Sequence, residues 1–253
     1  MTDRPATSTR SPVPIVLAGV VVLVVIVAVV AVLATRGDDD TTATPQPPAA
    51  TQPGGATDDL DANGDTGNTG DDRLPPEVVG EVRDVEIDGD ALPRFEPDSG
   101  VDPALGRRPP SLIAEDAAGV VHTISADIDG PVMLVFLAHW CPACNVEVPH
   151  LVQLDDDGRL PTDLNVYGVL TAIAPDRPGF PASEWIAGFG WPWVSVADGI
   201  DFDTEPPQWA AADAFGLSAY PYVVLVDDGV VVDRWIGELG VDGLADRIAA
   251  GVG

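Results

Sequence analysis

The chain of 253 residues contains no lysine, only three histidines and only two cysteines. Its twelve arginines stand against 41 acidic residues, which gives a formal net charge of −29. Proteins that bind nucleic acid carry a basic surface, so this balance excludes a nucleic-acid partner, and it would repel acidic partners. The sequence also lacks a glycine-rich loop that could hold phosphates, and we predict no cofactor.

Both cysteines stand in one tetrapeptide, Cys141-Pro142-Ala143-Cys144, directly after the run 133–140, which is apolar and strand-like and ends in Trp140, and ahead of a predicted helix over 145–154. A thiol at a helix N-terminus lies beside unpaired backbone N–H groups and the positive end of the helix dipole, which favour the thiolate. The second sulfur lies on the same helix face and can close a short disulfide. With no third cysteine to compete, we predict a redox-active pair.

A static structural disulfide and a zinc site are the alternative uses of these cysteines. A static disulfide across this three-residue spacing gains little from loop closure. A zinc site needs two further ligands, and the nearby imidazoles are those of His139 and His150, whose spacing matches no standard zinc pattern. We therefore predict no metal site.

Residues 15–34 form an unbroken apolar run of twenty residues, long enough as a helix to span roughly 30 Å. We predict a transmembrane helix here; the alternative is a cleaved signal peptide, whose apolar region is shorter, about 7–15 residues. Arg4 and Arg10 precede the run, whereas only Arg36 follows it. The positive-inside rule then places residues 1–14 in the cytoplasm and the C-terminal domain outside the cell membrane.

The rest of the chain divides by composition. Residues 35–76 are rich in Thr, Pro, Gly and Asp with almost no large apolar residue, which predicts a disordered acidic linker. Residues 77–105 read as an N-terminal extension, with a short strand pair near its start. From residue 106 to 253, apolar runs separated by turns predict one folded domain.

In this domain the pattern predicts a hairpin over 111–124, then buried strands and helices, one helix over 208–215, and a second hairpin over 222–235 with a turn at Asp227-Asp228-Gly229. The strand over 132–138 lacks polar alternation and should be covered on both faces. The fold class is therefore α/β, a central mixed sheet flanked by helices.

Two motifs resemble those of the membrane-anchored, thioredoxin-like proteins of the TlpA/ResA type. The first is Trp140-Cys-Pro-Ala-Cys144, followed by Glu147 and Pro149. The second is residues 214–229, which look like the thioredoxin segment with the cis-proline, Pro221, and its hairpin. The resemblance covers about 106–250 and implies a thioredoxin fold and thiol–disulfide exchange.

The roles of the site residues follow from position and from the resemblance. Cys141, the more exposed thiol at the helix entry, is predicted to attack a partner disulfide, and Cys144 to resolve the mixed disulfide. The resemblance makes Pro221 cis, leaving the backbone of Tyr220 free to pair with an extended substrate; an ordinary trans proline is the alternative. Trp140 is predicted to pack beside the site as a substrate platform.

The resemblance also places an acidic residue near the thiols. Glu147 is predicted to act as a base for Cys144 or to raise the pKa of that thiol; a solvated helix carboxylate is the alternative. Many thioredoxins carry a buried Asp six residues before the first cysteine, where this chain has Val135. His139 is either a cation that favours the thiolate or an ordinary surface side chain.

The prediction is an extracytoplasmic, membrane-tethered thiol–disulfide oxidoreductase acting on exported proteins that contain cysteines. It would exchange electrons with a membrane donor or acceptor, and the direction, reductant or oxidant, stays open. One alternative is a peroxiredoxin-like peroxidase, although residues 137–141 lack the threonine of that class. The other is a non-catalytic binding module of the cell envelope.

Overall fold

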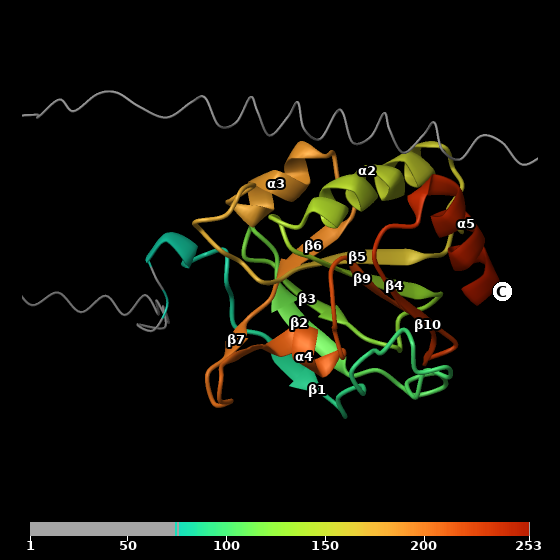
Figure 1. Cartoon of the computed structure of the whole chain (residues 1–253), viewed down its shortest axis with the longest axis horizontal. Helices are drawn as coiled ribbons and strands as arrows, with labels where there is room; N and C mark the ends of the chain where they lie inside the picture. The colour runs from blue at the N-terminus through green and yellow to red at the C-terminus, as the bar shows by residue number, and fades with distance from the viewer. Residues whose placement is uncertain (1–73, 75, 253) are drawn as a thin grey trace, which may run out of the picture. The chain divides into compact units, whose positions relative to one another are not determined.

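The computed structural model of the chain describes residue 74 and residues 76–252 (Figure 1). The predicted transmembrane helix over 15–34, the segment before it and nearly all of the predicted linker lie outside these residues. Among the helices that are described, none combines the length and apolar character needed to cross a membrane.

A five-stranded mixed sheet forms the centre of the domain, in the order β10-β9-β4-β5-β6. Strands β4, β5 and β6 are parallel to one another, whereas β9 runs antiparallel to both β4 and β10. The bounds are Val132–Leu137 for β4, Asn165–Leu170 for β5, Val194–Ala197 for β6, Tyr222–Asp227 for β9 and Val230–Ile236 for β10. The predicted mixed sheet and its C-terminal hairpin are confirmed.

Helices and a second sheet cover the two faces of this central sheet (Figure 1). One face carries α2 (Pro142–Asp156), α3 (Ala182–Gly188) and α5 (Gly240–Gly251). The other carries α4 (Ala210–Ala214) and a three-stranded sheet of β1 (Glu86–Asp88), β2 (Ser111–Glu115) and β3 (Val121–Ile124). The remaining elements are a 3-10 turn, η1 (Pro76–Val78), and a small pair of strands, β7 (Ile200–Asp201) and β8 (Gln208–Trp209).

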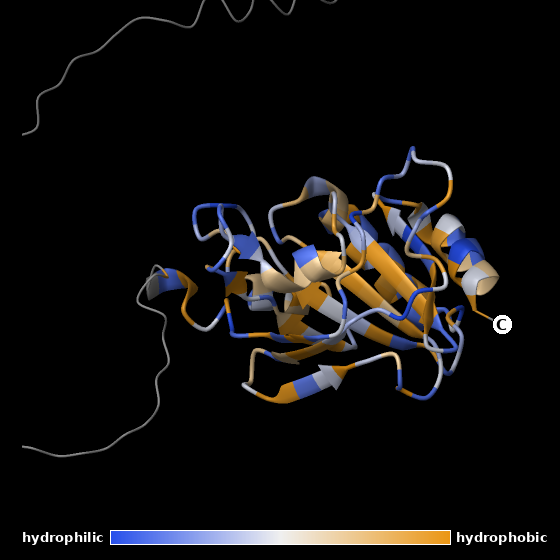
Figure 2. Cartoon of the chain, turned by 90° about the horizontal axis from the view of Figure 1, so that it is seen from below, coloured by the Kyte–Doolittle hydropathy of each residue, from blue (hydrophilic) through white to orange (hydrophobic). Residues whose placement is uncertain are grey.

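Strand β4 forms the middle of the core, and all six of its residues are buried. Val135 and Leu137 pack toward α2 and α5, whereas Leu134 and Phe136 pack toward α4 and β2. Successive strand residues point to opposite faces, so a strand covered on both sides must be apolar throughout. Figure 2 shows the same distribution, with hydrophobic residues along the central strands and hydrophilic ones in the surrounding loops.

The N-terminal extension packs against the domain. The backbone N–H of Leu92 donates to Ala214 O at 2.8 Å, and that of Phe95 donates to Gly216 O at 2.8 Å. Gly216 has a φ of +74°, and a Cβ there would lie 2.4 Å from Pro93 O, so the close approach requires glycine. A fragment beginning at residue 106 would therefore expose apolar surface that this segment covers.

One element is shorter than the sequence pattern predicts. A helix was expected over 208–215, but residues 208–209 form β8 and the helix α4 spans Ala210–Ala214. The strand arises because Gln208 and Trp209 pair with Asp201 and Ile200, a contact that helix propensity does not encode.

Candidate active site

The cysteine pair lies where β4 ends and α2 begins, at the edge of the sheet where the parallel strands end. Cys141 is the N-cap residue of α2, with extended backbone (φ −76°, ψ 121°), and Pro142 occupies the first turn. Proline is tolerated there because its missing N–H would have no partner within the helix. The backbone N–H of Cys141 donates to Ala138 O at 3.0 Å, which fixes the turn from strand to helix.

The two thiols are free and lie 3.3 Å apart. Cys141 is 7% exposed and Cys144 is fully buried, so the first thiol is the one open to a partner. Burial, together with the neighbouring Cys141, raises the pKa of the Cys144 thiol well above its usual range. Because Cys144 is buried behind Cys141, a partner disulfide cannot reach it directly, which suits it to the resolving role.

The loop before β9 closes over the thiols. The Tyr220–Pro221 peptide bond is cis, as the resemblance predicts, and Tyr220 O lies 3.7 Å from the Sγ of Cys141. The ring of Tyr220 meets that of Trp140 edge to face, with 6.1 Å between centroids. Burial raises the pKa of the Tyr220 phenol to about 12, so this side chain stays neutral beside the thiols.

Trp140 is half-buried and fixed on both sides. Its Nε1–H donates to Ala172 O at 2.8 Å, and one face of its ring carries the guanidinium of Arg177, 5.2 Å from the centroid. The structure thus brings Trp140, Cys141, Cys144 and the Tyr220–Pro221 bond together.

His139 differs from both expectations for it, because it is 1% exposed and neutral. Its Nδ1 lies 2.9 Å from Pro178 O, a carbonyl that only accepts, so Nδ1 carries the proton. Nε2 then accepts from the N–H of Ala174 at 3.1 Å. Burial lowers the pKa of His139, and the imidazole fastens the β5–α3 loop instead of supplying a cation to the thiolate.

We expect His139 to make the domain less stable as the pH falls below about 6.5, the ordinary pKa of histidine. The unfolded chain takes up the proton first because the folded-state pKa is lower, so stability is lost as pH falls, with a limiting slope of about 1.4 kcal/mol per pH unit. Urea unfolding of the wild type and of His139→Gln at pH 7.5 and 5.5 measures it. The variant should be less stable at pH 7.5 but lose less on acidification; equal losses in both proteins would contradict the assignment.

Glu147 lies one turn after Cys144 on α2 and is fully buried. Its Oε1 accepts from the N–H of Leu239 at 3.0 Å and its Oε2 from that of Gly240 at 3.4 Å, so the carboxylate caps α5. His150 Nδ1 lies 3.2 Å from Oε2. No thiol is among the described partners of this carboxylate, and its role as a base for Cys144 stays a prediction.

A second buried carboxylate was missed by the sequence analysis. Asp198 follows β6 and is fully buried; its carboxylate accepts from the N–H groups of Gly199 and Ala211, both at 2.8 Å, and of Ala212 at 3.2 Å. Burial raises its pKa to about 6 despite these bonds, so its titration stabilises the fold as the pH falls from about 6 toward 3.8, opposite in sign to His139. The signal in the sequence that could have identified Asp198 is an acidic residue directly after an apolar strand.

Asp198 is linked to the site through Thr171, which occupies the corresponding place after β5. The buried Thr171 hydroxyl lies close to both the Asp198 carboxylate and the Tyr220 phenol, without reaching standard hydrogen-bond geometry with either. Below about pH 6 the Asp198 carboxyl is neutral, so it places no charge near the Tyr220 phenol.

Known proteins resemble the chain over the region that holds this site. It is 27% identical over 161 residues to the thiol:disulfide interchange protein HelX of Rhodobacter capsulatus, a match that covers 62% of this chain and 82% of HelX. It is 31% identical over 156 residues to the thiol:disulfide interchange protein DsbE homolog of Paracoccus denitrificans, covering 60% of this chain and 78% of the relative. The chain belongs to the thioredoxin-like thiol:disulfide interchange proteins of the TlpA/ResA/DsbE type.

This interchange protein is accordingly a thiol–disulfide oxidoreductase. Solved structures that it resembles include StoA from Bacillus subtilis (17% identity, TM-score 0.42, covering 57% of this chain and 98% of StoA). A secreted Mycobacterium tuberculosis disulfide oxidoreductase homologous to E. coli DsbE is also similar (20% identity, TM-score 0.40, covering 55% and 94%). No family model matches the chain.

Proposed function

We propose that this interchange protein is tethered to the outer face of the cell membrane and reduces disulfides in exported proteins. The observation that carries the redox role is the pair of free thiols 3.3 Å apart, with Cys141 beside the carbonyl of Tyr220 and Cys144 behind it. The tether rests on the apolar run 15–34 and on the arginines that precede it.

The exchange proceeds in two displacements. The Cys141 thiolate attacks one sulfur of the substrate disulfide, that S–S bond breaks, and the second substrate sulfur leaves as a thiolate and takes up a proton. Cys144, once deprotonated, attacks the Sγ of Cys141 in the mixed disulfide. The substrate leaves as a dithiol and the protein keeps a Cys141–Cys144 disulfide, so two electrons pass to the substrate.

The substrate backbone has a place to bind. Extended peptides pair with exposed main-chain groups, and the backbone of Tyr220 beside Pro221 offers such groups next to the attacking sulfur. Trp140 supplies the adjacent apolar surface. We propose these three residues as the substrate-binding part of the site.

The reducing direction is favoured by the two residues between the cysteines. Strongly oxidising pairs gain their potential from a stabilised thiolate of the attacking cysteine in the reduced form. Here the dipeptide Pro142-Ala143 lacks the histidine that stabilises this thiolate in strongly oxidising pairs. The electrons would come from a membrane donor that reduces the Cys141–Cys144 disulfide.

We expect a reduction potential closer to the roughly −270 mV of thioredoxin than to the roughly −120 mV of the oxidant DsbA. Equilibrium titration of the full-length protein against glutathione or dithiothreitol measures it. A value above roughly −180 mV would reverse the proposed direction. The absence of a reversible two-electron couple would reject the exchange mechanism itself.

A further inference from the structure

The β5–α3 loop holds an exposed cation beside the active site. The guanidinium of Arg177 lies over the ring of Trp140, the residue before Cys141. Within the described part of the chain, no ion pair or hydrogen bond engages that guanidinium. The other described arginines all bind a carboxylate or a backbone carbonyl: Arg83, Arg94, Arg107, Arg108, Arg159, Arg234 and Arg247.

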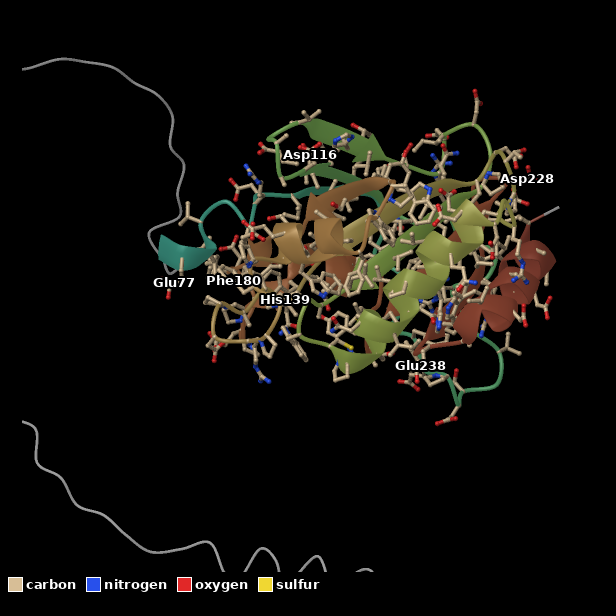
Figure 3. The ribbon with its side chains drawn as sticks, turned by 90° about the horizontal axis from the view of Figure 1, so that it is seen from above. Glu77, Asp116, His139, Phe180, Asp228 and Glu238 are labelled. Carbon is tan, nitrogen blue, oxygen red and sulfur yellow. The ribbon has the colours of Figure 1, made fainter. Side chains whose placement is uncertain are left out.

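Hydrogen bonds hold the β5–α3 loop in place on both sides of Arg177. His139 accepts from the N–H of Ala174 and donates to the carbonyl of Pro178, and the N–H of Arg177 closes the turn onto Ala174 O at 3.1 Å. Gly179 follows with a φ of +82°, and a Cβ there would lie 2.8 Å from His139 O. In Figure 3, Phe180 lies beside His139, and their ring centroids are 6.0 Å apart.

Trp140 fixes the cation's position relative to the reacting sulfur. One face of the indole carries Arg177, its ring meets Tyr220 edge to face, and the carbonyl of Tyr220 lies 3.7 Å from the Sγ of Cys141. A stacked guanidinium keeps its planar N–H groups free to bind a carboxylate with two hydrogen bonds. The β5–α3 loop therefore holds the unpaired guanidinium of Arg177 in a position to bind a carboxylate. Only the ring of Trp140 separates it from the Tyr220–Pro221 loop, where we propose that the substrate peptide binds.

We propose that Arg177 is a specificity-determining residue that binds an acidic side chain of the protein substrate near its reacting cysteine. This inference rests on the proposed function and names a class of substrate for it. Because an extended peptide rises about 3.3 Å per residue, the acidic residue should stand within about three residues of that cysteine.

The negative charge of the rest of the chain makes the protein more selective for substrates whose acidic residue contacts Arg177 directly. A net charge of −29 repels acidic polypeptides in general. Salt screens such long-range repulsion beyond about 10 Å at 0.1 M ionic strength, whereas a direct contact persists. An acidic substrate is therefore favoured only where its carboxylate reaches Arg177 itself.

The test uses two synthetic peptides, each with one disulfide, that differ only in carrying Glu or Gln two residues before the reacting cysteine. We expect the reduced full-length protein to reduce the Glu peptide about fivefold faster, an effect of the size of an exposed ion pair. Arg177→Gln should bring the ratio of the two rate constants to about one, whatever its effect on the rate of the Gln peptide. Arg159→Gln, which makes the same charge change after the far end of α2, should keep the wild-type ratio.

The outcomes separate this inference from the proposed function. Equal rates for both peptides in the wild type, or a preference that survives Arg177→Gln, would overturn the role of Arg177 while leaving disulfide exchange intact. Arg177→Gln could instead slow both the alkylation of Cys141 by neutral iodoacetamide and the reduction of the Gln peptide by the same factor. Arg177 would then act on the thiol, and the specificity role would be wrong. Reduction of neither peptide would reject the proposed function.

Discussion

Replacing Cys141 by Ser is expected to lower the rate of disulfide exchange by roughly a thousandfold or more, because the hydroxyl is a far weaker nucleophile. The structure leaves no substitute, since Cys144 is fully buried behind Cys141 and its pKa is raised. The measurement is the rate at which the reduced protein opens a peptide disulfide.

Cys144→Ser is the matched comparison. This variant keeps the attacking thiol but cannot resolve the mixed disulfide, so a covalent complex with the substrate should accumulate and be visible on a non-reducing gel. Cys141→Ser should form no such complex. Substrate capture by Cys141→Ser at the wild-type rate would show that the two roles are assigned the wrong way round.

Asp102→Ala is expected to lower the free energy of unfolding by about 3 kcal/mol, because it leaves a buried cation without its counter-charge. The side chain of Arg234 is fully buried; its Nε donates to Asp102 Oδ2 at 2.7 Å and its Nη2 donates to Oδ1. Burial disfavours the carboxylate, but the hydrogen bonds and charge of Arg234 outweigh it and hold the pKa of Asp102 below its usual range.

The guanidinium of Arg234 also links the N-terminal extension to the β9–β10 hairpin, which follows the Tyr220–Pro221 loop. The Nη1 of Arg234 donates to Pro93 O at 2.9 Å and to the hydroxyl of Tyr222 at 3.0 Å, and that hydroxyl donates to Phe215 O at 2.8 Å. Tyr222 directly follows Pro221. Loss of Asp102 should therefore loosen both the segment before the domain and the loop beside the thiols.

Urea unfolding of Asp102→Ala and of Asp127→Ala measures this effect. Asp127 pairs with Arg108 at the exposed surface, so its removal should cost less than about 1 kcal/mol. Because the pKa of Asp102 is lower in the folded chain than in the unfolded chain, its ionised form stabilises the fold above about pH 4. This stabilisation is lost as the pH falls through the folded-state pKa, so the difference in stability between Asp102→Ala and the wild type should shrink in acid. Equal, small losses in both variants would show that the pair contributes little.

The sequence alone determined the parts of this protein whose signals are local. The apolar run of β4, the cysteine pair after it, and the turn at Asp228 and Gly229 each predicted the element that the structure contains. These signals succeed because burial on both faces, helix entry and a tight turn each restrict a few adjacent residues. The thiol chemistry follows from the same short segment.

Only the tertiary structure decided what the charged and polar groups do. Glu147 meets the start of α5, 92 residues along the chain, and Arg234 meets Asp102 across 132 residues. His139 is neutral because two backbone groups of a distant loop occupy both of its nitrogens. A buried polar group takes whichever donors and acceptors the packing of distant segments brings to it, and no local pattern states which those will be.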